Sequence, residues 1–211
     1  GEESRGDAEF VRELCRGLGL RCEVRSLRLE GRAGLQERAR RERYRIAGEV
    51  AGRLGASAVA VGHNADDVAE TLLLNLARGS GLRGLSGIPP VRGRVCRPLI
   101  ERTRAEILGY LEALGQGYRV DSTNLLPKYA RNRVRLEVMP VLEELHPGAV
   151  RNMARAAALL REDLAALEEL AAGVVREEGG EAGMSVAELD GLPPALRRYA
   201  VRRAYAAVAP E

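Results

Sequence analysis

The sequence of 211 residues lacks tryptophan, and it has a single phenylalanine, a single lysine and only three cysteines. Cys15, Cys22 and Cys96 form no Cys-x-x-Cys spacing, and their odd number leaves one unpaired, so neither a disulfide scaffold nor a zinc site is favoured. Free cysteines are typical of a reducing compartment, and we therefore expect a cytoplasmic protein. No apolar run approaches the roughly 20 residues of a membrane-spanning helix, so no membrane association is expected.

The basic residues are almost all arginine. Lysine and arginine together number 33 against 30 acidic residues, which gives a net charge of +3 and a pI of about 9.0. Arginine suits bidentate phosphate binding and stacking on bases, although GC-rich coding also produces an arginine excess. Composition therefore permits a nucleic-acid partner without requiring one.

Short apolar runs alternate with helical patterns in the first part of the chain. This alternation favours an α/β domain with a parallel sheet and helices on both faces. Strands are expected over residues 22–29, 57–63 and 94–100, and helices over 7–18, 35–55, 65–77 and 103–115.

The pattern changes after Asp121, where a turn-rich stretch leads into a helix. From Gly148 onward we expect only helices: one long amphipathic helix and a last helix with proline near its start. The sequence therefore predicts two domains, an α/β domain over residues 1–140 and a small all-helical domain over residues 141–211.

The stretch "VGHNADDVAET" places several acids where a helix begins. His63 and Asn64 follow an apolar strand, at the carboxyl edge of a parallel sheet where ligands bind. Asn64 suits the N-cap, and Asp67 and Glu70 share one face of the helix. Two interpretations stay open: the acids serve the helix dipole, or a cation lies against them. The glycine-rich stretch that follows, with Arg78, Gly79 and Gly81, can approach phosphate, although most such loops are merely turns.

The segment "GHNADDVAETLLLNLARGSGLRGL" resembles the PP-loop ATP pyrophosphatase superfamily, and specifically the bacterial tRNA-isoleucine lysidine synthetases. Three further segments support the narrower resemblance in the same order: "ARRERYR" (39–45), "RPLIERTRAEI" (97–107) and "DSTNLLPKYARNRVR" (121–135). The resemblance is strong over residues 35–140 and weaker in the helical tail, which looks like the tRNA-contacting domain of that family. It implies a Rossmann-like PP-loop fold of the adenine nucleotide alpha hydrolase type.

The resemblance implies a two-step reaction on the wobble cytidine of the isoleucine tRNA with a CAU anticodon. ATP, with Mg²⁺, adenylates the C2 carbonyl oxygen, and the amine of L-lysine then displaces AMP. By the same resemblance, Asp67 and Glu70 bind the lysine cation, and Arg43 and Arg135 are catalytic because they offset phosphate charge. Arg43 also has a simpler interpretation as part of a solvated charge run.

Other residues are expected to shape the site or to contact tRNA or ATP, and no protein residue is expected to bind a metal. They are His63, Asn64, Arg78, Gly79, Gly81, Asn124, Arg131 and Asn132. Helical spacing further predicts that Arg131 and Arg135 share one face, toward the cleft, and that Arg133 points outward.

One departure from the family pattern is large. The Ser-Gly-Gly-x-Asp-Ser loop that holds the ATP phosphates in the family does not occur in these residues. We therefore expect the chain to belong to a longer parent protein and to have little or no activity alone. Two alternatives stay open: a tRNA thiolation enzyme of the same superfamily and a non-catalytic RNA-binding paralogue. A homodimer is compatible with the sequence.

Overall fold

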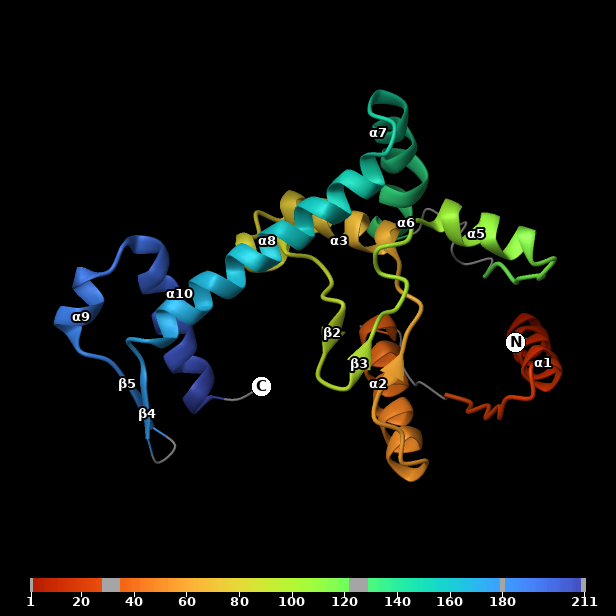
Figure 1. Ribbon diagram of the computed structural model, residues 1–211, viewed down its shortest axis with the longest axis horizontal. Helices are drawn as coiled ribbons and strands as arrows, with labels where there is room; N and C mark the ends of the chain where they lie inside the picture. The colour runs from red at the N-terminus through yellow and green to blue at the C-terminus, as the bar shows by residue number, and fades with distance from the viewer. Residues whose placement is uncertain (1, 28–34, 122–128, 179–180, 210–211) are drawn as a thin grey trace.

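The computed structural model describes residues 2–27, 35–121, 129–178 and 181–209. Figure 1 shows the long helix α8 (Ala149–Ala172) joining two groups of elements. α9 (Val186–Gly191), α10 (Pro194–Val208) and the strands β4 (Arg176–Glu178) and β5 (Glu181–Gly183) lie at one end of α8. α3 (Ala65–Ala77) packs along the rest of α8.

A small sheet lies at the centre of the first group of elements. Its order is β1-β3-β2, in which β1 (Val59–Ala60) pairs with β3 (Val95–Cys96) in parallel, with Val59 opposite Val95. β2 (Val91–Arg92) pairs with β3 in antiparallel fashion. The parallel pairing of the two apolar runs is thus confirmed, although both strands are shorter than the expected ranges.

The expected strand over residues 22–29 is wrong for its described part, residues 22–27, which form no ladder. Alternating apolar side chains make a strand only when a neighbouring strand takes up the backbone hydrogen bonds. Residues 22–27 have no such neighbour among the described residues; instead, Glu23 forms an ion pair with Arg53 of α2 (Leu35–Arg53).

Helices agree with the sequence more closely. α1 (Glu2–Gly17) and α2 fall where helical spacing places them, and α3 spans the predicted residues. α5 (Arg104–Ala113) begins with the predicted capping box of Thr103 and Glu106. The glycine-rich stretch is not wholly a loop, because α4 (Leu82–Leu85) forms within it.

The buried core lies between α3 and α8. One cluster joins Ala65 and Ala69 of α3 to Val150 of α8 through Met139, and a second packs Val68 against Ala157. Both clusters combine residues from before and after the expected boundary near residue 140. Helix α8 therefore shares its apolar interior with α3, across the expected boundary.

The expectation of an all-helical tail is wrong, because β4 and β5 form an antiparallel hairpin after α8. Its strands read "REE" and "EAG", without the apolar alternation that predicts a half-buried strand. The dipeptide Gly179-Gly180 between them was the available hairpin signal. Within the described residues, no helix has the length and apolar character needed to cross a membrane.

Candidate functional site

The start of α3 is fixed by a reciprocal pair of hydrogen bonds. The backbone N–H of Asp67 donates to Asn64 Oδ1 at 3.1 Å, and the backbone N–H of Asn64 donates to Asp67 Oδ2 at 3.0 Å. Asp66 points elsewhere, and its Oδ2 accepts the backbone N–H of Arg104 at 2.7 Å. The capping interpretation of this stretch is therefore confirmed for Asn64 and Asp67.

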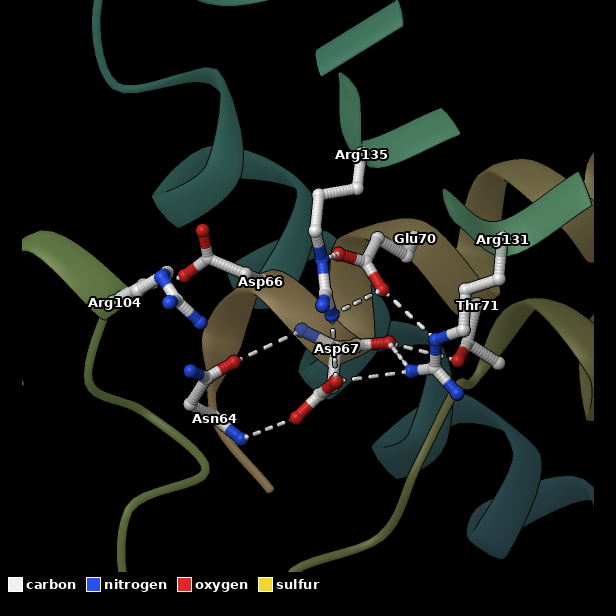
Figure 2. Close-up of polar contacts among 8 residues, drawn as sticks. All are labelled: Asn64, Asp66, Asp67, Glu70, Thr71, Arg104, Arg131 and Arg135. Atoms are coloured by element: carbon white, nitrogen blue, oxygen red, sulfur yellow. Dashed lines mark hydrogen bonds and ion pairs between the residues drawn. The ribbon is translucent and has the colours of Figure 1, made fainter. Parts of the chain in front are cut away.

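A cation also lies against the acids, and it is arginine. Figure 2 shows Arg131 and Arg135 reaching Asp67 and Glu70 from a neighbouring helical segment. Arg135 Nε donates to Glu70 Oε1 at 2.6 Å, and Arg131 Nε donates to Glu70 Oε2 at 2.8 Å. Nη2 of each arginine also reaches Asp67 Oδ1, at 3.1 Å from Arg131 and 3.5 Å from Arg135. Two carboxylates and two guanidinium groups thus form one neutral cluster.

Burial divides this cluster into an inner and an outer acid. The side chain of Glu70 is 1% exposed, whereas that of Asp67 is 18% exposed. Burial alone would lower the pKa of Arg135, but its hydrogen bond to Glu70 and the negative charges nearby raise that pKa instead. Arg135 therefore stays charged over Glu70, and Asp67 is the acid that reaches open space.

The helical segment that carries the arginines contains an unusual turn. α6 (Ala130–Arg133) continues into the π-helix η2 (Val134–Val138) and then α7 (Met139–Leu145). Arg131 and Arg135 point toward α3, while Arg133 is 64% exposed and pairs with Glu137. The predicted orientation of the three arginines is confirmed. π-turns inside helices occur frequently at functional sites.

The cluster forms one wall of a cleft of about 710 Å³ beyond the carboxyl end of β1. Five arginines line the cleft, and Asp67 supplies the one carboxylate among its lining residues in the described part of the chain. The lining residues are Arg40, Arg43, Tyr44, Ala47, Val59, Ala60, Val61, Gly62, His63, Asn64, Asp67, Arg104, Arg131 and Arg135. Such a wall attracts anions, and polyphosphate most strongly.

The structure brings together six of the residues expected at the site: Arg43, His63, Asn64, Asp67, Arg131 and Arg135. Glu70 lies directly beneath them. Asn132 is half-buried on α6 and does not line the cleft, and Asn124 lies outside the described residues.

The glycine-rich stretch lies apart from this cleft. Arg78 and Gly79 follow the C-terminal end of α3, whose 13 residues rise about 20 Å from Asn64. Gly81 lines a different cavity, of about 1300 Å³, which α10 also borders. Sequence adjacency suggested one site, but the helix between the two segments separates them.

Sequence reasoning gave no role to two cleft residues on α2. The guanidinium of Arg40 lies 5.6 Å from the ring centre of Tyr44, one turn further along the helix. This spacing, four residues apart, was the signal that could have found them. Arg104, the first residue of α5, also lines the cleft. Its backbone N–H donates to the carboxylate of Asp66, and this bond holds the start of α5 against α3.

Comparison with known proteins agrees with this arrangement. The profile of the PP-loop domain, an ATP-binding domain, matches residues 1–142. The chain belongs to the PP-loop family. The α/β fold and the resemblance read from the motifs are thereby confirmed.

Curated relatives carry the narrower resemblance. The tRNA(Ile)-lysidine synthase of Symbiobacterium thermophilum is 45% identical over 97% of this chain and 46% of its own length. That of Caldanaerobacter subterraneus is 41% identical over the same shares, and that of Salinispora tropica is 45% identical over 93% of this chain and 61% of its own length. The chain thus spans about half the length of the curated relatives it matches.

Among solved structures, the U34-tRNA thiolase NcsA from Methanococcus maripaludis, with its [4Fe-4S] cluster, is similar in fold. The TM-score is 0.54 at 21% identity, over 74% of this chain and 56% of that one. In this chain Cys15 lies beside Cys22 near the end of α1, and Cys96 lies on β3, which Figure 1 shows apart from α1. No group of three or more metal-ligating side chains occurs in the described residues.

Proposed function

We propose that this chain is part of an enzyme that ligates lysine to C2 of the wobble cytidine of the isoleucine tRNA with a CAU anticodon, through an adenylated cytidine. The observation that carries the proposal is the identity of 41–45% to curated tRNA(Ile)-lysidine synthases over nearly the whole chain. The relatives match the PP-loop domain and the helical tail together, so the proposal does not rest on one motif.

The cleft supplies the groups that such a reaction needs. ATP is a polyphosphate, and the arginines of the cleft fit its charge. We assign Arg43 and Arg135 to the offset of negative charge that develops on the phosphates during adenylation. Arg131 and Asn132 shape this wall or contact the tRNA backbone. Mg²⁺ usually keeps several waters and binds through phosphates and one or two carboxylates, so it would accompany ATP without a protein cage.

Lysine would bind at Asp67, where a carboxylate reaches the cleft. Its cationic amine replaces part of an arginine's interaction with Asp67, while Glu70 keeps both arginines in place. His63 and Asn64 border the same space. We place Arg78, Gly79 and Gly81 on a more distant surface, where they would contact tRNA rather than the reacting atoms.

The same proposal covers the organisation of the protein. We propose a catalytic PP-loop domain over residues 1–140, a tRNA-contacting domain over residues 141–211, and a cytoplasmic location. A homodimer stays a prediction that sedimentation of the full-length protein would test.

The decisive experiment uses the full-length protein that contains this chain. The purified protein is incubated with ATP, isoleucine tRNA and labelled lysine, and in parallel with a labelled sulfur donor. We expect lysine in the tRNA and AMP in solution. Sulfur incorporation without lysine would establish the thiolation alternative, and tRNA binding without either product would establish a non-catalytic RNA-binding protein.

A further inference from the structure

Arg97 is a buried arginine directly after β3. The residue as a whole is 5% exposed. The backbone N–H of Arg97 donates to the carbonyl of Pro90 at 2.9 Å, and its Nη1 donates to the carbonyl of Pro89 at 2.8 Å. Its Nε is buried without a hydrogen-bond partner, and no carboxylate forms an ion pair with Arg97 in the part of the chain that the structure describes.

An unpaired buried cation is unfavourable, because its charge has left water without a counter-charge. Arg131 and Arg135 avoid this penalty through Glu70. The side chain makes one of these bonds, to the carbonyl of Pro89, and a neutral donor could make it at a lower cost. The charge of Arg97 therefore needs a separate explanation.

The sheet places this charge beside His63. Val59 lies opposite Val95, and the backbone N–H of Val61 donates to the carbonyl of Cys96 at 3.0 Å. Arg97 directly follows Cys96, so its backbone lies close to Val61, two residues before His63. Arg97 does not line the cleft, whereas His63 does. The backbone of Arg97 thus lies next to the segment that leads to His63, while its side chain is buried outside the lining of the cleft.

His63 is surrounded mainly by positive charge. Burial lowers the pKa of His63, the carboxylate of Asp67 opposes that shift, and Arg97, Arg40 and Arg131 add to it. These groups come from α3, the end of β3, α2 and α6, and Arg104 of α5 and Arg135 of η2 add positive charge to the same cleft. Nδ1 of His63 is buried without a partner, which leaves Nε2 as the nitrogen that can meet a ligand.

We propose that Arg97 is a positioning residue that acts through His63: its buried, unpaired charge, next to the segment that carries His63 into the cleft, adds to the burial of the ring in favouring an uncharged imidazole toward the ligand. A neutral imidazole has a nitrogen that can accept a hydrogen bond or a proton from a ligand amine, and an imidazolium has none. The role toward a ligand amine rests on the proposed function, whereas the charge of His63 can be tested without it.

The test is a histidine titration by NMR in the full-length protein, with the signal of His63 identified by its loss in His63→Gln. In the unmodified protein we expect His63 to titrate below the usual value of about 6.5. In Arg97→Gln, which keeps a donor for Pro89 but removes the charge, the pKa should rise. In Arg97→Lys, which keeps the charge, it should stay near that of the unmodified protein.

Arg161 offers a matched control. Its Nη2 donates to the carbonyls of Ser86 and Ile88 at 2.9 and 3.0 Å, so it holds the same segment, but its charge is not among the main influences on the pKa of His63. Arg161→Gln should leave the titration of His63 unchanged. The proposal is overturned if Arg97→Gln does not raise the pKa, or if Arg161→Gln raises it equally. It is also overturned if His63 of the unmodified protein titrates at or above the usual value, a result that needs no variant to fold.

Discussion

Asp67 and Glu70 lie one turn apart on α3, yet the structure gives them different surroundings. Glu70 is enclosed by α3 and two guanidinium groups, whereas Asp67 also borders the cleft. A ligand cation can therefore reach Asp67 with little rearrangement, while access to Glu70 would require an arginine to leave. Asp67 and Glu70 share one face of the helix, but only Asp67 of the two is placed to bind a ligand cation from the cleft.

We predict that Asp67→Asn in the full-length protein raises KM for lysine by roughly 10- to 150-fold, because it removes a charge-assisted hydrogen bond worth about 1.5–3 kcal/mol. Steady-state kinetics at varied lysine concentration would measure this change. Asp66→Asn is the matched control, since it removes the same charge from the same turn but does not line the cleft. An unchanged KM in Asp67→Asn, with a lowered Tm, would leave Asp67 with the capping role alone.

The arginines two residues apart allow a similar comparison. Arg135→Ala should reduce the single-turnover rate of adenylation by roughly 100-fold or more, because charge offset acts most strongly in the transition state. Arg133→Ala should leave that rate nearly unchanged, since Arg133 is exposed and pairs with Glu137 on the outside. Quench-flow measurement at saturating tRNA gives both rates. A larger loss in Arg133→Ala would show that the arginine assignment is wrong.

At the scale of the element, sequence reasoning succeeded where local chemistry decides the outcome. The bounds of α3 followed from Asn64 at its start and Gly79 at its end, where φ is +72°. The strands were less predictable, because a strand depends on a distant partner. Residues 22–27 have an alternating pattern and no ladder, and the hairpin β4–β5 has a ladder without the pattern.

The start of α8 depends on a side chain from the preceding helix. Its N-cap, Gly148, has no side chain to offer, and the carboxylate of Glu143 instead accepts the N–H groups of Gly148 and Val150, each at 2.8 Å. These hydrogen bonds, chiefly that from Val150, lower the pKa of Glu143. A lowered carboxyl pKa stabilises the fold above the usual value of about 4.3, and this contribution is lost as pH falls through the lower, folded value.

We therefore predict that Glu143→Gln lowers the stability at neutral pH by about 1 kcal/mol, or roughly 2–4 °C in Tm. The difference from the unmodified protein should shrink as the pH falls through the lowered pKa of Glu143. Calorimetry at pH 7 and in acid would measure both effects. Glu144→Gln, at the exposed neighbouring position, should change neither, and an equal effect there would contradict the capping role.

At the scale of the whole molecule, the site could be predicted only in part. The motifs found the acids, His63 and the arginines of residues 131–135, because they lie at one strand end and on one helical face. They did not show that Arg78 and Gly81 lie away from this cleft, since a 13-residue helix separates neighbours in sequence. They could not reveal Arg97, whose importance comes from burial and from its register beside β1.

Gly87 lies close to both α3 and α8, and its backbone has a φ of +67°. A Cβ built there would lie 3.2 Å from Val68 Cγ1 and 3.4 Å from Ala157 Cβ. Gly87→Ala should therefore lose about 1–2 kcal/mol to backbone strain and roughly 1–3 kcal/mol more to crowding. Gly79→Ala, with a similar φ of +72° and open space around it, should lose only the first part. Equal melting temperatures for the two variants would show that α3 and α8 do not pack this closely.

The core shared by α3 and α8 has a consequence during synthesis on the ribosome. Ala69 and Val150, which belong to one apolar cluster, are 81 residues apart in the chain (150 minus 69). At about 5–20 residues per second, α3 waits roughly 4–16 s for the helix that covers it. Until then its apolar face, with Val68 and Leu72, is not covered by α8. Slower translation through the codons for residues 77–150 would lengthen that interval and increase aggregation of the newly made protein.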